Sequence, residues 1–487
     1  MKTEHTLGGA SDLPASRRAL IFGPAAAARE GFEASGNGEP SVEAPHAPST
    51  ASWLGDVPRL LRAQERAYQL HRERGERVPA ARAALSVARA QAMFRGELAT
   101  ASEWLQRARE LIRGLEPSAV HGWLAIREAE FCHLARHDTG TARRLAWLAG
   151  ELALRLGAMD LQLEAMALEG LTLIREGHMA HGMRRLDQAA AAVVGGEISN
   201  YDIVGQICCH VIAACDRTGD YGRAAEWCEA LRQACRHPSL RPLLTLCRER
   251  DAALLILRGH WNEAEAELHT ASLEAERFGS CPRSVLRLRL AELRRRQGRG
   301  EEAAMLYQQA RPHLLADLGL AALALESGDP AAASVLVEKP LRALPADQRL
   351  DRAPGLALAV RVRIALGDLD AAEPSVQELR SLAAVVCTRP MEALASFSDA
   401  ELASARQDVD GARRGYADAA AAWGSSGLPL ETGQARMALG RVLLESGHVS
   451  DAVTELRTAR NQFATLGATS EEKRAAALLQ DIRARDA

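Results

Sequence analysis

A small residue, usually Ala, recurs about every 40 residues along most of this 487-residue chain. Each copy lies just past a predicted helix-to-helix turn. Such a regular period is the signature of a helical repeat array, in which stacked neighbours bury a shared core. The ten positions are Ala101, Ala142, Gly182, Ala224, Ala264, Ala303, Ala333, Ala372, Ala412 and Ala452.

The segments around these positions share one pattern, as in "RGHWNEAEAELHTA" and "QGRGEEAAMLYQQA". A Gly fits the left-handed cap that ends the first helix. A second helix follows, with small or apolar residues at i, i+4 and i+7, as at Ala264, Leu268 and Ala271. The first helix often has a small residue as well, so the two helices are predicted to cross closely. These residues are Gly170, Ala252, Ala291, Ala321 and Gly440.

The pattern predicts an all-α, right-handed superhelical solenoid of ten to twelve tetratricopeptide-like helix pairs. The period near 40 exceeds the roughly 34 residues usual for such repeats, so we expect longer helices or loops. The interval from Ala303 to Ala333 is shorter, and we expect a shortened helix there. The predicted organisation is a degenerate first repeat or flexible segment over residues 1–52, the solenoid over 53–467, and a capping helix over 468–487.

The residue composition and the net charge limit the classes of function that we expect for this chain. Aromatic residues make up only 4% of the chain, which predicts a core built from Ala and Leu. The net charge of −3 gives no field that would attract nucleic acid or anionic membrane. No apolar run approaches 18 residues, so no transmembrane helix is predicted. We therefore expect a cytoplasmic protein with no direct nucleic-acid or membrane partner.

Several segments resemble the tetratricopeptide, MalT-like repeat region of bacterial LuxR-type transcriptional regulators. The resemblance is carried by "WLGDVPRLLRAQERAYQLHRERGE", "WLQRARELIRGLEPSAVHGWLAIREAE" and "ICCHVIAACDRTGDYGRAAEWCE", among others. It implies a sensory or protein-interaction region. Such regulators end in a DNA-reading helix-turn-helix, which the sequence lacks, and no "GxxxxGK[ST]" nucleotide loop occurs. DNA binding and nucleotide hydrolysis are therefore not expected.

A group of cysteines in the middle of the chain has two interpretations. With a nearby histidine it could form a thiolate metal site or a redox switch. However, no C-x-x-C pair occurs, and free Cys often fills small core positions. We favour core packing and expect no metal and no cofactor. The residues are Cys208, Cys209, His210, Cys215, Cys228, Cys235 and Cys247.

Charged residues also interrupt otherwise apolar first helices. In a solenoid of this kind the first helices line the concave groove, so these charges could recognise a peptide, a protein or a small-molecule effector. The alternative is pairing between neighbouring repeats, or solvent exposure. The groove candidates are Arg127, Glu128, Glu130, Glu164, Glu169, Asp216, Arg248, Asp251, Arg287 and Glu292.

The sequence thus favours a binding scaffold in a regulatory pathway. The alternative is an enzyme, or a component of one, with a metal- or thiol-dependent site near the Cys-rich repeats. No "GxSxG" elbow and no motif-supported carboxylate pair occurs, so nothing in the sequence argues for catalysis.

Overall fold

The computed structural model describes residues 57–136, 138–198, 200–234, 241–279, 281–346 and 348–485. The predicted N-terminal segment 1–52 lies outside these residues. Over the described residues the chain is entirely helical apart from turns and loops, with no strand.

Within the described residues, twenty-two α-helices, α2 to α23, follow one another as antiparallel neighbours. The helices in the first place of each pair are α3 (Arg77–Ala90), α5 (Ala119–Phe131), α7 (Met159–Arg175), α9 (Tyr201–Thr218), α11 (Arg241–Leu257), α13 (Arg283–Arg296), α15 (Leu314–Glu326), α17 (Arg349–Ala365), α19 (Arg389–Ala405), α21 (Pro429–Glu445) and α23 (Thr469–Arg485). Those in the second place are α2 (Val57–Glu73), α4 (Leu98–Ile112), α6 (Thr139–Leu156), α8 (Met179–Val194), α10 (Tyr221–Ala234), α12 (Trp261–Phe278), α14 (Gly300–Ala310), α16 (Pro330–Ala343), α18 (Leu369–Val386), α20 (Val409–Ser425) and α22 (Val449–Leu466).

The predicted solenoid of tetratricopeptide-like pairs is confirmed, and the part of the chain that the structure describes forms ten complete pairs, from α3–α4 to α21–α22. All ten recurring small residues lie in second helices and are buried. They are small because the partner helix lies against them. A methyl group on Gly170 of α7 would lie 2.8 Å from the carbonyl oxygen of Gly182 of α8, and one on Gly440 of α21 would lie 2.7 Å from Leu456 of α22.

The turns within the pairs use the left-handed backbone that the glycine pattern predicts. Gly177, Gly219 and Gly259 end their first helices with φ of 92°, 77° and 81°. In the turn between α19 and α20, Gln407 takes this conformation with φ of 63°. The short interval between Ala303 and Ala333 also has its expected effect, because α14 and α15 span 11 and 13 residues where most other helices span 14 to 18.

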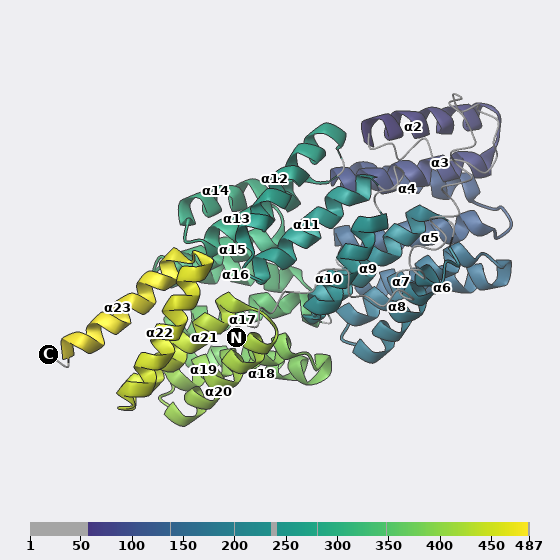
Figure 1. Ribbon diagram of the computed structural model, residues 1–487. Coiled ribbons are helices and arrows are strands. Elements are labelled where there is room, and N and C mark those ends of the chain that lie inside the picture. Colours follow the sequence, from purple (N-terminus) through teal and green to yellow (C-terminus); the bar gives the residue numbers. More distant parts are fainter. Residues whose placement is uncertain are drawn as a thin grey trace, which may run out of the picture.

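The solenoid winds tightly enough that successive superhelical turns touch (Figure 1). On the turns after α3, α7, α9, α11 and α13, the start of a first helix five pairs later packs against the turn. A methyl group on Gly219, after α9, would lie 3.1 Å from Pro390 of α19, and one on Gly259, after α11, would lie 3.0 Å from Pro429 of α21. The same relation joins Gly96 to Pro282, Gly177 to Arg349, and Gly298 to Ser470.

Charged residues also join the two superhelical turns. Asp351 of α17 accepts hydrogen bonds from Arg175 of α7 at 2.5 Å and from Arg217 of α9 at 2.9 Å. Arg175 also donates to Gln348 at 3.1 Å, and both of these side chains are buried. Because guanidinium and carboxylate are paired away from water, this contact fixes how the later pairs lie on the earlier ones.

None of the described helices combines the length and the apolar composition that crossing a bilayer requires.

Candidate functional site

Four consecutive first helices, α3, α5, α7 and α9, bring polar side chains together inside the N-terminal half of the solenoid. We call this group the interior cluster. Its members are Arg89, Arg127, Glu130, Glu164, Gln206 and His210. Around it lies the largest apolar core of the described residues. Buried charges are rare in proteins unless they are paired, so such a group marks a candidate site.

Arg127 of α5 is the centre of the ionic part of the interior cluster. Its Nη1 donates to both carboxylate oxygens of Glu130 at 2.6 Å, and its Nη2 donates to Oε1 of Glu164 at 2.9 Å. Glu164 is fully buried, and its Oε2 has no hydrogen-bond partner among the described residues. One guanidinium therefore holds two carboxylates but leaves one buried acceptor unsatisfied.

A chain of hydrogen bonds continues from α3 to α9. Arg89 Nη2 donates to Gln206 Oε1 at 3.0 Å, so the Gln206 amide nitrogen faces His210 Nε2 at 3.1 Å. An amide nitrogen only donates, and His210 Nε2 must therefore accept. In the neutral ring the proton then lies on Nδ1, which has no partner among the described residues. His210 thus presents a buried, unsatisfied donor.

Burial and the neighbouring charges set the protonation states in the interior cluster. Burial lowers the pKa of His210 to about 4, so the ring is neutral near pH 7. Burial also raises the pKa of Glu164, against the opposing effect of Arg127. For Glu130 burial would raise the pKa, but the charges of Arg127 and Arg89 together lower it below its usual range. Glu130 is therefore the more acidic of the two carboxyl groups.

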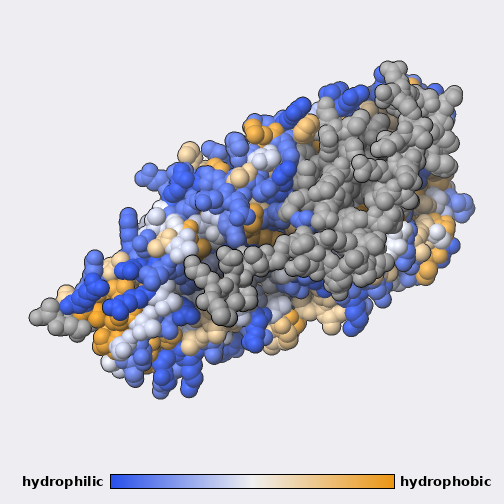
Figure 2. Space-filling model, in the orientation of Figure 1, coloured by the Kyte–Doolittle hydropathy of each residue, from blue (hydrophilic) through white to orange (hydrophobic). Residues whose placement is uncertain are grey.

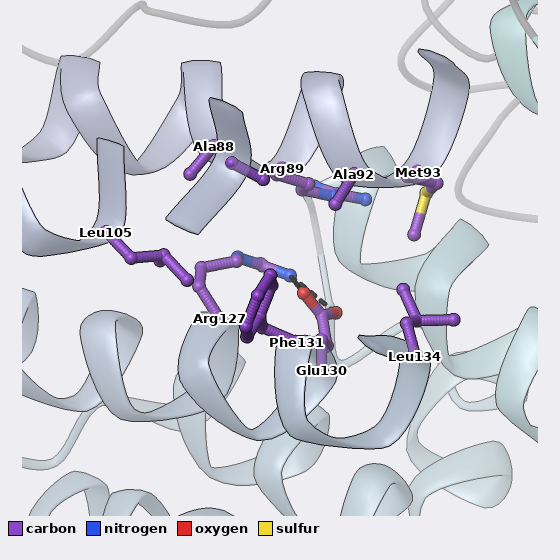
Figure 3. Close-up of a pocket in the computed structure, with 10 residues that line it drawn as sticks. Ala88, Arg89, Ala92, Met93, Leu105, Arg127, Glu130, Phe131 and Leu134 are labelled. Atoms are coloured by element: carbon purple, nitrogen blue, oxygen red, sulfur yellow. Dashed lines mark hydrogen bonds and ion pairs between the residues drawn. The ribbon is translucent and has the colours of Figure 1, made fainter. Parts of the chain in front are cut away.

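A small cavity of about 20 Å³ opens beside Arg89, Arg127 and Glu130 (Figure 3). Apolar side chains form its walls, and in Figure 3 Met93 and Leu134 lie across from each other at one side. The volume suits one water-sized group. The remaining lining residues are Ala88, Ala92, Ala101, Leu105 and Phe131.

Two π-helical segments flank this cavity. They are η2 (Gln91–Arg95), which follows α3, and η3 (Cys132–Arg136), which follows α5. Each contributes to the lining, η2 through Ala92 and Met93 and η3 through Leu134. Such π segments are rare and occur often at functional sites. The arrangement is suited to binding a small polar group, and it contains no nucleophile placed against a base.

Of the ten predicted groove residues, the structure gathers Arg127, Glu130 and Glu164 into the interior cluster. Five of the others form ion pairs, four with a neighbouring helix and one, Glu292, within its own helix α13. Glu128 accepts from Arg109 at 2.5 Å, and Arg248 donates to Glu267 at 2.6 Å. The remaining pairs are Glu169 with Arg185 at 3.4 Å, Asp216 with Arg250 at 3.6 Å, and Glu292 with Arg295 and Arg296 at 2.9 and 2.7 Å.

Two predicted groove residues lie apart from these pairs. Asp251 of α11 is buried close to Cys228, and Arg287 of α13 is half-buried without an ion pair to any described residue. Arg89 and Gln206 were not predicted for the groove. The same signal, a polar residue in an apolar first helix such as "IVGQICC", also applies to them.

The cysteines lie mainly in the core. Cys208, Cys215 and Cys228 are buried within the largest apolar cluster, and Cys209 packs against it. Burial raises the pKa of Cys215 to about 12 and that of Cys228 further above its usual value, which disfavours the thiolates that metal binding needs. Across the described ranges, no three His, Cys, Asp or Glu side chains are grouped as metal ligands. Cys235 lies outside the described residues, and Cys247 is part of α11.

Comparisons with known proteins give a fold likeness only. No protein-family model matches the chain, and no curated protein matches it. Among solved structures, a chain of the crystal structure of the APC/C hetero-tetramer Cut9–Hcn1 aligns with 95% of this chain and 96% of its own length. The TM-score is 0.46 and the sequence identity 12%. The assignment to tetratricopeptide-like pairs rests on the helix contacts within this chain.

Proposed function

We propose that this chain is a cytoplasmic binding scaffold of a regulatory pathway, similar in role to the sensory or protein-interaction region of bacterial LuxR-type regulators. The resemblance of its repeats to that region supports the regulatory part of the proposal. The binding part is supported by an exposed apolar surface on α6, formed by Trp147, Leu148 and Leu154. Large apolar side chains exposed together are typical of protein interaction sites.

The α6 surface is the observation that carries the proposal. Trp147 and Leu154 are 48% and 62% exposed and lie two helical turns apart on one side of the helix. The charges of the first helices, in contrast, are mostly used in pairs within the chain. A protein partner is therefore expected on the outer face of α6 rather than against the paired charges inside the solenoid.

Cross-linking of the full chain in a native lysate, followed by mass spectrometry, tests this proposal. We expect a defined partner whose cross-links lie on α6, and its loss with Trp147→Ala and Leu154→Glu combined. Met305→Glu is the matched control, because Met305 is a similarly exposed apolar residue on α14. Equal recovery with the α6 variant and the control would contradict an interaction through α6.

The interior cluster supports a second candidate function, the sensing of a small polar effector. Two observations support it. His210 Nδ1 and Glu164 Oε2 are buried without partners among the described residues. Arg89, Arg127 and Glu130 of the same interior cluster line a small cavity between two π segments. Thermal unfolding in the presence of a library of small metabolites tests it. We expect a compound that stabilises the wild-type chain and no longer stabilises Glu164→Gln. A library without any stabilising compound would count against effector binding.

A further inference from the structure

A histidine lies at the junction of two superhelical turns. His133 belongs to η3, and its Nδ1 lies 2.7 Å from Nη1 of Arg175. Arg175 of α7 is also the residue that donates to Asp351 of α17, in the later superhelical turn. We call the group formed by His133, Arg175, Arg217, Gln348 and Asp351 the seam.

The seam is a polar group in the interior of the solenoid. In Figure 2 hydrophilic residues predominate on the described outer surface, whereas the seam lies where α7 and α9 pack against α17. Arg175 and Gln348 are buried there, and His133, Arg217 and Asp351 are half-buried. Because water has limited access, the charges of the seam act on one another more strongly than charges at the surface do.

The contact between Arg175 and His133 requires an unprotonated Nδ1. A guanidinium carries only donors, so Nδ1 of His133 has to accept the hydrogen bond. A proton on Nδ1 would remove this acceptor and place an imidazolium against the guanidinium. Histidine is the side chain whose charge ordinarily changes between about pH 5 and pH 8. Mild acid therefore turns an attractive contact of Arg175 into a repulsive one.

One carboxylate serves two guanidinium groups at the seam. Asp351 accepts from Arg175 at 2.5 Å and from Arg217 at 2.9 Å. Burial would raise the pKa of Asp351, but the charges of Arg217 and Arg175 lower it overall. Asp351 thus stays ionised while a histidine titrates, and a charge on His133 would be the third positive charge beside it.

Acidic side chains on the neighbouring parts of α5, α6 and α7 each have another partner. They are Glu128 with Arg109, Glu130 with Arg127, Asp138 with the Thr141 backbone N–H at the start of α6, and Glu176 with Arg143 just after α7. The carboxylate placed to balance a charge on His133 is therefore Asp351, which the two arginines already share.

We infer that protonation of His133 loosens the seam, so that mild acid weakens the contact of α7 and α9 with α17. With a neutral His133, the Arg175 guanidinium donates to Asp351, Gln348 and His133. With a charged His133, Arg175 loses the acceptor at Nη1 and gains a like charge, so the state in which α17 has separated from α7 becomes more populated. The closed seam is thus favoured at neutral pH and is weakened as the pH falls. This inference goes beyond the proposed function and does not depend on it.

Hydrogen–deuterium exchange of the full chain, measured by mass spectrometry for peptides of α17, tests the inference. His133→Gln is the variant to compare, because its side-chain oxygen can accept from Arg175 and does not titrate. At about pH 7.5 we expect α17 to exchange equally in both proteins, which also shows that the variant is folded. At about pH 5.5 we expect α17 to exchange faster in the wild-type chain, by roughly tenfold, the factor that corresponds to one pKa unit.

The rise of this ratio between the two pH values is the measured effect. Comparing the two proteins at the same pH removes the intrinsic pH dependence of exchange. It also removes the contribution of His210, which both proteins contain. A ratio that does not rise between about pH 7.5 and about pH 5.5 would overturn the inference.

Three controls locate the effect at the seam. Asp351→Asn should speed α17 exchange at both pH values, and unchanged exchange would also contradict the inference. His260→Gln should respond to pH like the wild-type chain, because His260 is 54% exposed in the turn after α11. The start of α23 is the internal reference, since its contact with an earlier turn, from Thr469 Oγ1 to the Gln297 carbonyl oxygen at 2.8 Å, does not titrate in this range. A rise at α23 as large as that in α17 would mean that acid acts on the whole fold and would overturn the assignment to His133.

Discussion

The Arg175 guanidinium of α7 and the Asp351 carboxylate of α17 lie 2.5 Å apart, although 176 positions separate them in the chain. Arg175 is almost completely buried, and Arg217 reaches the other oxygen of the same carboxylate. This contact links two successive superhelical turns. Extending the solenoid so that these superhelical turns separate would break this buried ion pair.

Replacing Asp351 by Asn should therefore destabilise the folded chain. The substitution leaves the buried Arg175 charge without its counter-charge, and breaking a buried pair in this way costs about 3 kcal/mol or more. Urea unfolding followed by circular dichroism measures the change. Asp370→Asn is the control, since Asp370 is fully exposed and lies 3.7 Å from Arg406. Equal midpoints for the two variants would show that the Arg175–Asp351 contact does not stabilise the fold.

His210 should make stability depend on pH in a defined window. Its pKa is about 4 in the folded chain and 6.5 in the unfolded chain, because burial disfavours the charged ring. Between these values the unfolded chain binds the proton more readily, so stability falls as the pH is lowered from about 6.5 to about 4. The loss is on the order of 3 kcal/mol for a shift of this size.

Chemical unfolding at several pH values, for the wild-type chain and His210→Gln, checks this expectation. Glu164 acts in the opposite direction, because its raised pKa makes the folded chain bind a proton first as the pH falls. Only the difference between the two proteins therefore isolates His210. It should shrink as the pH falls through the window, and a constant difference from pH 7 to pH 4 would rule out a buried neutral histidine.

Two mid-helix glycines should respond oppositely to Ala. At Gly170 a methyl group would lie 2.8 Å from the Gly182 carbonyl oxygen and 2.9 Å from Leu186, and overpacking of this kind costs about 1–3 kcal/mol. At Gly150 of α6 the nearest atom, on Ala165, is 3.7 Å away. Gly150→Ala should be neutral or stabilise by up to about 1 kcal/mol, because Ala favours the helix. Thermal unfolding of both variants tests whether α7 and α8 cross as closely as described.

Cysteine labelling should distinguish the exposed thiol of Cys387 from the buried thiols. Cys387, at the end of α18, is exposed, whereas Cys132, Cys208, Cys215, Cys228 and Cys281 are buried. Iodoacetamide followed by peptide mass spectrometry should modify Cys387 in the native chain and these five buried thiols only after unfolding. Rapid native labelling of Cys215 or Cys228 would revive the hypothesis of a thiol-dependent site, because burial should hold both as unreactive thiols.

The fold was largely predictable because the patterns that specify it lie within single helix pairs. The spacing of Ala264, Leu268 and Ala271 places them on one helix face, and all three are buried as expected. The glycine before most second helices predicted the turn there, since few other residues tolerate positive φ. Part of the candidate site could also be predicted from the sequence, because Arg127, Glu130 and Glu164 interrupt apolar helices.

What the sequence by itself determined is thus the helix pair: its length, its turn and the small residues at its crossing. Only the tertiary structure decided which pairs meet after one superhelical turn, as for Arg175 with Asp351 and Gly219 with Pro390. The same holds for the bond from Arg89 to Gln206, 117 positions away. The physical reason is that a small rotation between neighbouring pairs accumulates along the array. No local sequence pattern contains this accumulated rotation, yet it decides which residues become buried partners.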